Sequence, residues 1–92
     1  MIEDLKGLHR LYNEVGKIQD RLPNKRGKKD YSDIEYEIIK KATELRNNCD
    51  SIILKLKQNN QLNLFSEVDN IKHGAQEIIN NPYLKKGGQV DI

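Results

Sequence analysis

Cysteine is nearly absent from this sequence, because Cys49 is the single cysteine among 92 residues. One thiol cannot form an intrachain disulfide, and it cannot supply the several thiolates of a cysteine-rich zinc site. A chain without a disulfide framework suits a reducing compartment, so we interpret the protein as cytoplasmic.

Long apolar runs are absent as well. No stretch of about 18 consecutive apolar residues is present to span a membrane. The opening residues, MIEDLKG, include acidic residues and form no apolar run. We therefore expect neither a secretory signal nor a membrane partner.

Aromatic and apolar residues are few relative to charged ones. Aromatic residues make up 5% of the chain, tryptophan is missing, apolar residues reach 36% and charged residues 33%, with a mean hydropathy of −0.82. A chain of this length forms one domain, here with a thin core under a solvated surface. A thin core gains stability from self-association, so we expect a homo-oligomer.

The charges are nearly balanced. The chain has 16 basic and 14 acidic side chains, for a formal net charge of +2. Sequence-independent binding to a nucleic-acid duplex depends on a strong positive field. We therefore expect no strong nucleic-acid binding.

Three segments repeat apolar residues every three or four positions, which is the spacing of an amphipathic helix. The first predicted helix runs from Ile2 to Leu22 and is ended by Pro23. Its apolar stripe consists of Leu5, Leu8, Leu11, Tyr12, Val15, Ile18 and Leu22.

The second segment predicts a long helix. Ser32 and Glu35 fit a capping box, in which each side chain accepts a hydrogen bond from the other residue's backbone N–H group. The stripe that follows consists of Ile38, Ala42, Leu45, Cys49, Ile52 and Leu56. A stripe with a period of about 3.5 residues predicts lengthwise packing against neighbouring helices.

The third predicted helix begins near Ser66 and ends at Asn80-Asn81-Pro82. Its stripe consists of Leu64, Val68, Ile71, Ala75 and Ile78. We therefore predict an all-α fold, a three-helix antiparallel bundle with a long central helix. The single domain is expected to cover residues 1–82, with a C-terminal tail over residues 83–92.

The residue types that carry out catalysis do not converge. His9 and His73 fall on different predicted helices and lack the spacing of a metal-binding pair. Cys49 lies on an apolar stripe, where a thiol behaves as a small buried apolar group. No glycine-rich loop follows a strand to hold a phosphate. We predict that the protein is not an enzyme and uses no metal ion or cofactor.

One short segment carries a specific pattern. Gln61-Leu62-Asn63-Leu64-Phe65 resembles the bacterial sliding-clamp-binding pentapeptide, commonly written Gln-Leu-Ser/Asp-Leu-Phe, at its four anchoring positions. The resemblance implies that Gln61, Leu62, Leu64 and Phe65 contact a protein partner. In that family the glutamine amide hydrogen-bonds at one end of the site, and the leucine-phenylalanine pair enters an apolar pocket. Docking on the DNA sliding clamp is the function that we favour.

The same segment also has a purely structural interpretation. Leu64 continues the stripe of the third helix and Leu62 can seal the end of the hairpin, so the segment can pack inward. Phe65 precedes the predicted cap, Ser66, and its expected apolar contact at the fourth helical position is the polar Asn70. Both interpretations stay open at this point.

A basic segment suggests an alternative ligand. Its residues are Lys25, Arg26, Lys28 and Lys29. Such a loop can hold phosphates, and Tyr12 could stack on a base beside it. The third helix loosely resembles the closing helix of small phage proteins that sequester cyclic nucleotides, although Glu77 stands where that family has an arginine. The resemblance implies an oligomeric counter-defence protein with a nucleotide ligand or a host defence protein as its partner.

A third alternative rests on size and charge only. A small helical protein of this kind could provide immunity to a bacteriocin. All three interpretations describe a non-enzymatic binding protein of bacterial or phage origin.

Overall fold

The computed structural model describes residues 2–23 and 30–84. No β-strand occurs within these ranges, and the predicted all-α fold with a long central helix is confirmed. The helices within these ranges are α1 over Ile2–Gln19, α2 over Ser32–Gln58, the short 3₁₀ helix η1 over Leu62–Leu64, and α3 over Phe65–Asn80.

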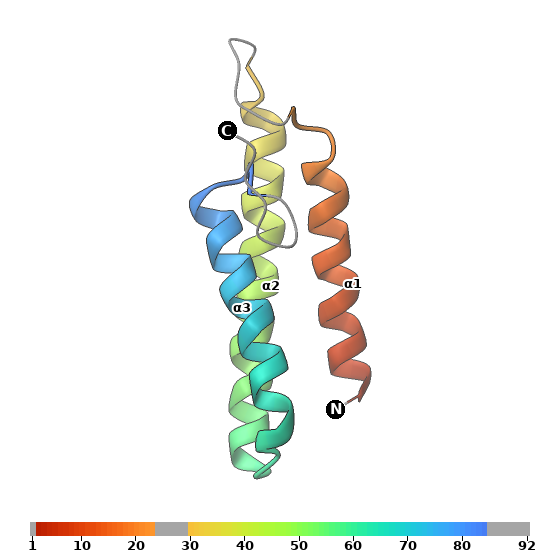
Figure 1. Ribbon diagram of the computed structural model, residues 1–92, viewed down its shortest axis with the longest axis vertical. Coiled ribbons are helices and arrows are strands. Elements are labelled where there is room, and N and C mark those ends of the chain that lie inside the picture. The colour runs from red at the N-terminus through yellow and green to blue at the C-terminus, as the bar shows by residue number, and fades with distance from the viewer. Residues whose placement is uncertain (1, 24–29, 85–92) are drawn as a thin grey trace.

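The helices run alternately up and down along an elongated molecule of 49 × 20 × 18 Å. Figure 1 shows α1 and α3 both lying along α2, and the two outer helices contact each other much less than they contact α2. The turn between α2 and α3 lies at one end of the long axis, farther out than the start of α1.

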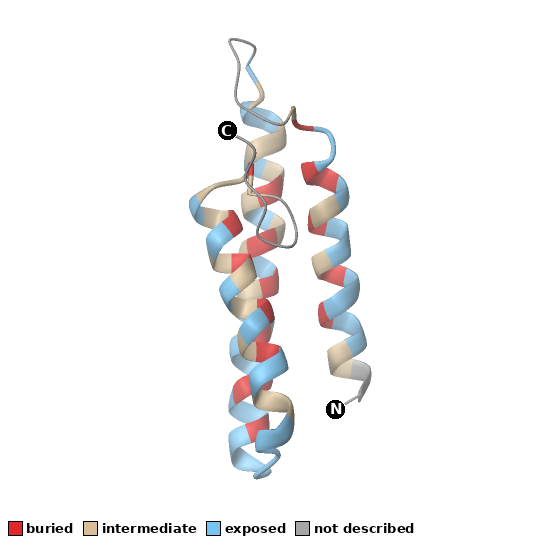
Figure 2. Ribbon diagram, in the orientation of Figure 1, coloured by how far each residue is buried: buried red, intermediate tan, exposed pale blue. Residues whose placement is uncertain are grey.

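The predicted stripes are the buried faces of the helices (Figure 2). Every stripe residue of α2 is buried, and so is every stripe residue of α3 from Val68 onward. In the first stripe, Leu5 and Tyr12 are only partly buried, whereas the other residues are in the core. Leu22 is one of these core residues although α1 ends at Gln19, before the predicted end of the first helix. The spacing of apolar residues therefore predicted the inward face of each helix.

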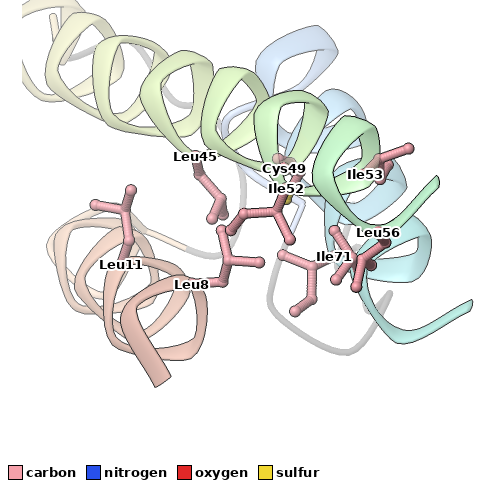
Figure 3. Packing of buried hydrophobic residues seen from close by; sticks show 10 residues of the cluster. Leu8, Leu11, Leu45, Cys49, Ile52, Ile53, Leu56 and Ile71 are labelled. Carbon is pink, nitrogen blue, oxygen red and sulfur yellow. The ribbon is translucent and has the colours of Figure 1, made fainter. Parts of the chain in front are cut away.

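The core consists of two clusters. The turn-side cluster, which lies near the α2–α3 turn, consists of Leu8, Leu11, Leu45, Cys49, Ile52, Ile53, Leu56, Val68, Ile71 and Ala75. The loop-side cluster, which lies toward the other end, consists of Val15, Ile18, Leu22, Ile38, Ala42, Ile78 and Tyr83. In Figure 3, Leu8 of α1 points toward Ile52 of α2 and Ile71 of α3, so all three helices contribute to the turn-side cluster.

Cys49 belongs to this turn-side cluster and has an exposed fraction of 0%. Burial, with a smaller contribution from the Asp50 carboxylate, raises the pKa of the Cys49 thiol to about 11. A thiol that stays protonated and enclosed is neither a nucleophile nor a metal ligand. The interpretation of Cys49 as a buried apolar residue is confirmed.

The start of α2 differs from the predicted capping box. Tyr31 occupies the cap position and makes no side-chain cap hydrogen bond, so Ser32 is already helical. The Ser32 N–H donates instead to the Asp30 carboxylate at 2.9 Å. The Glu35 carboxylate accepts a hydrogen bond of 2.8 Å from the Tyr83 hydroxyl. A partly buried hydroxyl needs an acceptor, so Glu35 serves the tertiary structure rather than the helix end.

The domain extends beyond residue 82, where the tail was predicted to begin. Tyr83 belongs to the loop-side cluster and is 9% exposed. The buried side-chain amide of Gln19 donates a hydrogen bond of 3.1 Å to the Pro82 carbonyl and another to the Leu84 carbonyl. Tyr83 and Leu84 are therefore part of the folded domain, and the rest of the predicted tail lies outside the described residues.

Candidate docking site

The α2–α3 turn is a Schellman motif. Asn59 caps α2, and Asn60 has a φ of 59°, in the left-handed region. The Gln61 N–H donates to the Leu56 carbonyl at 2.9 Å, and the Asn60 N–H donates to the Lys57 carbonyl at 3.3 Å. These two bonds satisfy carbonyl groups at the end of α2 and fix the backbone that leads into Gln61.

The first three residues of the pentapeptide are open to solvent. Gln61 and Asn63 are exposed, and Leu62 has an exposed fraction of 61%. None of the residues of η1 is buried. In Figure 2 the exposed class dominates the end of the molecule around this turn. Leu62 therefore does not seal the hairpin end, and the outward orientation is found at Gln61 and Leu62.

The last two residues of the pentapeptide are turned toward the core. Leu64 and Phe65 are partly buried and pack against the turn-side cluster. Leu64 occupies the cap position of α3 and Phe65 is its first helical residue, without a side-chain cap hydrogen bond. The prediction of Ser66 as the cap is wrong, because α3 begins two residues earlier than that cap requires. The inward orientation holds for Leu64 and Phe65 only.

One contact reaches Phe65, and a second holds the residue two positions further on, Glu67. The Lys57 ammonium nitrogen lies 5.5 Å from the centroid of the Phe65 ring, within the range of a cation–π interaction. His9 Nε2 lies 3.0 Å from Glu67 Oε1, which joins α1 to the first turn of α3. The sequence offered no signal for the second contact, because His9 and Glu67 are 58 positions apart and meet only in the folded chain.

The alternative nucleotide site is not assembled by the described residues. Lys25, Arg26, Lys28 and Lys29 lie outside them. Tyr12 packs against both core clusters. Its hydroxyl lies so close to Gly74 that a Cβ on residue 74 would stand 2.6 Å from the hydroxyl oxygen. Burial, and to a smaller extent the Glu77 carboxylate, raises the pKa of this hydroxyl. Tyr12 thus has a role in helix packing, and its stacking on a base stays a prediction.

A shallow groove of about 310 Å³ lies between α1 and α2. Its lining residues are Asp4, Gly7, Leu8, Asn48, Ser51, Ile52 and Lys55.

Among residues 2–23 and 30–84, no three His, Cys, Asp or Glu side chains are grouped so that they could hold a metal ion. Over the same residues, no helix combines the length and the apolar character that crossing a membrane requires.

Comparison of the chain with models of protein families, with curated proteins and with solved structures found no match. The candidate site therefore rests on its own geometry and chemistry.

Proposed function

We propose that this protein is a non-enzymatic binding protein whose α2–α3 turn docks on the bacterial DNA sliding clamp. The observation that carries the proposal is the 61% exposed fraction of Leu62, which directly follows the Gln61 held by the Schellman motif and belongs to a pentapeptide that resembles the clamp-binding motif. Full burial of a leucine side chain by a partner contributes about 1.5 to 3 kcal/mol. An exposed leucine at the end of the molecule is therefore a favourable first anchor.

Each of the four matching residues has a role that its chemistry allows. The side-chain amide of Gln61 has donors and an acceptor, so it can set the direction of the docked segment. Leu62, Leu64 and Phe65 supply the apolar area that an enclosed pocket would bury. A protein that occupies this site on the clamp would recruit itself to replication and repair, or would keep other proteins away from them.

The nucleotide-binding alternative has less support. Tyr12, its one described candidate residue, has its hydroxyl against Gly74 and its ring in the helix packing. An immunity function has no specific residue to support it.

Surface plasmon resonance against an immobilised bacterial clamp tests the proposal. The chain offers a matched pair of leucines, because Leu62 is 61% exposed and Leu54 of α2 is 58% exposed. We expect Leu62→Ala to weaken binding about tenfold, which corresponds to about 1.4 kcal/mol. Leu54→Ala should bind like the parent. Both variants should fold, since each removes an exposed side chain.

A double variant tests the other half of the segment. Leu64→Ala/Phe65→Ala should abolish binding, with circular dichroism to show that the helices persist. Absence of binding by the parent protein, or equal losses in Leu62→Ala and Leu54→Ala, would contradict the proposed function.

A further inference from the structure

On the basis of the proposed function, we propose that only part of the docking segment, residues 61–65, is accessible to a partner in this conformation, and that partner binding unwinds η1 and the first turn of α3. The clamp would thus select a locally opened form of the protein, and α1 would regulate how often that form occurs.

The orientations of the four anchoring residues carry the inference. Gln61 and Leu62 are exposed, whereas Leu64 and Phe65 pack against the turn-side cluster of the protein's own core. A partner that takes up all four side chains cannot find them on one surface in this conformation. Leu64 and Phe65 have to leave their present contacts before they can enter a partner's pocket.

The local structure makes this opening inexpensive. None of the residues of η1 is buried, and the hydrogen bond from the Leu64 N–H to the Gln61 carbonyl is long, at 3.4 Å. The start of α3 has no side-chain cap hydrogen bond. Helix ends with few buried contacts and exposed backbone bonds open at a small fraction of the free energy of global unfolding.

The opening has a fixed boundary on one side. The Schellman motif keeps the Gln61 N–H bonded to the Leu56 carbonyl, so Gln61 stays attached to the end of α2. On the other side, Val68 is fully buried and anchors the remainder of α3. The segment that opens therefore runs from Leu62 to Glu67.

Contacts from two helices stabilise the closed form, in which Leu64 and Phe65 pack against the core. Lys57 of α2 lies over the Phe65 ring, and His9 of α1 contacts Glu67 in the first turn of α3. The contact between His9 and Glu67 does not involve the pentapeptide. Its removal therefore shifts the equilibrium between closed and open forms without changing the surface that the partner binds.

Because only the open form binds, the open fraction determines the apparent affinity for the partner. When only a fraction of the molecules is competent to bind, the apparent Kd equals the intrinsic Kd divided by that fraction. Loss of an exposed contact between helices should raise the open fraction about two- to threefold, and should lower the apparent Kd by the same factor.

The first test measures the affinity of the whole protein for the clamp. His9→Ala should bind about two- to threefold more tightly than the parent. The matched control is Arg10→Ala, which removes the next side chain of α1, an exposed one, and leaves the contact with Glu67 in place. Unchanged or weaker binding by His9→Ala would overturn the inference.

The second test is amide hydrogen exchange with and without the clamp. Because α3 begins at Phe65, the i→i−4 pattern of an α-helix pairs the N–H groups of Val68 and Asp69 with the carbonyls of Leu64 and Phe65. Unwinding removes these acceptors, so both amides should exchange faster in the complex than in the free protein. Ile52, in the core of α2, should be unchanged. Slower or equal exchange at Val68 and Asp69 would mean docking in the helical form and would overturn the inference.

The two tests separate the inference from the proposed function. If neither the parent nor His9→Ala binds the clamp, the proposed function is contradicted. If both bind with equal affinity and α3 stays protected, the function stands and only the coupled opening is overturned.

Discussion

The hydroxyl of Tyr12 in α1 lies against the backbone of Gly74 in α3, at a point where a Cβ on residue 74 would stand 2.6 Å from the hydroxyl oxygen. This close approach matters because α1 and α3 contact each other much less than either helix contacts α2. Glycine in a helix interior costs about 1 kcal/mol relative to alanine. At position 74 that cost is offset by the packing of Tyr12 of α1 against α3.

Gly74→Ala should therefore destabilise the protein, although alanine favours the helix. The added methyl group has to displace a partly buried ring, and overpacking of this kind costs about 1 to 3 kcal/mol. Urea unfolding followed by circular dichroism measures the change. Gly7→Ala is the control, because a Cβ there would meet nothing within 4 Å. That variant should be stabilised by up to about 1 kcal/mol. A gain in both variants would mean that Tyr12 does not press on α3.

Asn60 offers a prediction at the turn. Its φ of 59° suits glycine better than any residue with a side chain. Asn60→Gly should raise the free energy of unfolding by about 0.5 to 1 kcal/mol, and Asn60→Val should lower it. Asn59, with a φ of −98°, is the comparison, since Asn59→Gly should bring no gain. Equal effects at both positions would contradict a left-handed Asn60.

Tyr83 offers a prediction at the far end of the domain. Tyr83→Phe removes the hydroxyl that donates to the Glu35 carboxylate and should cost about 1 kcal/mol. Tyr83→Ala also empties part of the loop-side cluster and should cost about 3 to 5 kcal/mol. Thermal unfolding of both variants tests this. An unchanged Tm for Tyr83→Ala would mean that residue 83 is not part of the folded domain.

The burial of Cys49 leads us to expect that the free energy of unfolding depends on pH. Its pKa is raised from 9.0 to about 11 in the folded protein, mainly by burial. Between those pH values the unfolded chain loses the thiol proton while the folded chain keeps it, so the free energy of unfolding should fall as pH rises. The Cys49 contribution to the slope is at most about 1.4 kcal/mol per pH unit.

The measurement compares urea unfolding at pH 8 and pH 10 in the parent and in Cys49→Ala. The alanine variant should be less stable at pH 8 and should lose less stability between the two pH values. Tyr12, whose pKa is also raised, contributes equally to both proteins and cancels in the comparison. Identical losses in the two proteins would contradict a buried, protonated thiol.

The apolar spacing was sufficient to predict the three helices and their buried faces, because a stripe such as that of α2 is a property of neighbouring turns. Cys49 and Leu56 are buried as this spacing requires. The helix ends were harder to predict. Glu35 fits a capping box locally, but Tyr83 contacts its carboxylate from 48 positions away. A pattern within four residues carries no information about such a partner.

The docking segment shows the same limit. The sequence offered an inward or an outward orientation for the whole pentapeptide, whereas the structure divides it between Leu62, which is exposed, and Phe65, which is partly buried. The division follows from where α3 begins. That position depends on packing against the turn-side cluster, which the five residues themselves do not encode.

The most direct test of the docking surface is an NMR titration of the isotope-labelled protein with unlabelled clamp. We expect the backbone amides of residues 61–65 to be the first signals that shift or broaden, and the amides along α1 beyond His9 and at the loop-side end of α2 to respond last. If the clamp instead perturbs the outer face of α1 first, or leaves residues 61–65 unchanged at saturating concentration, the α2–α3 turn is not the docking site.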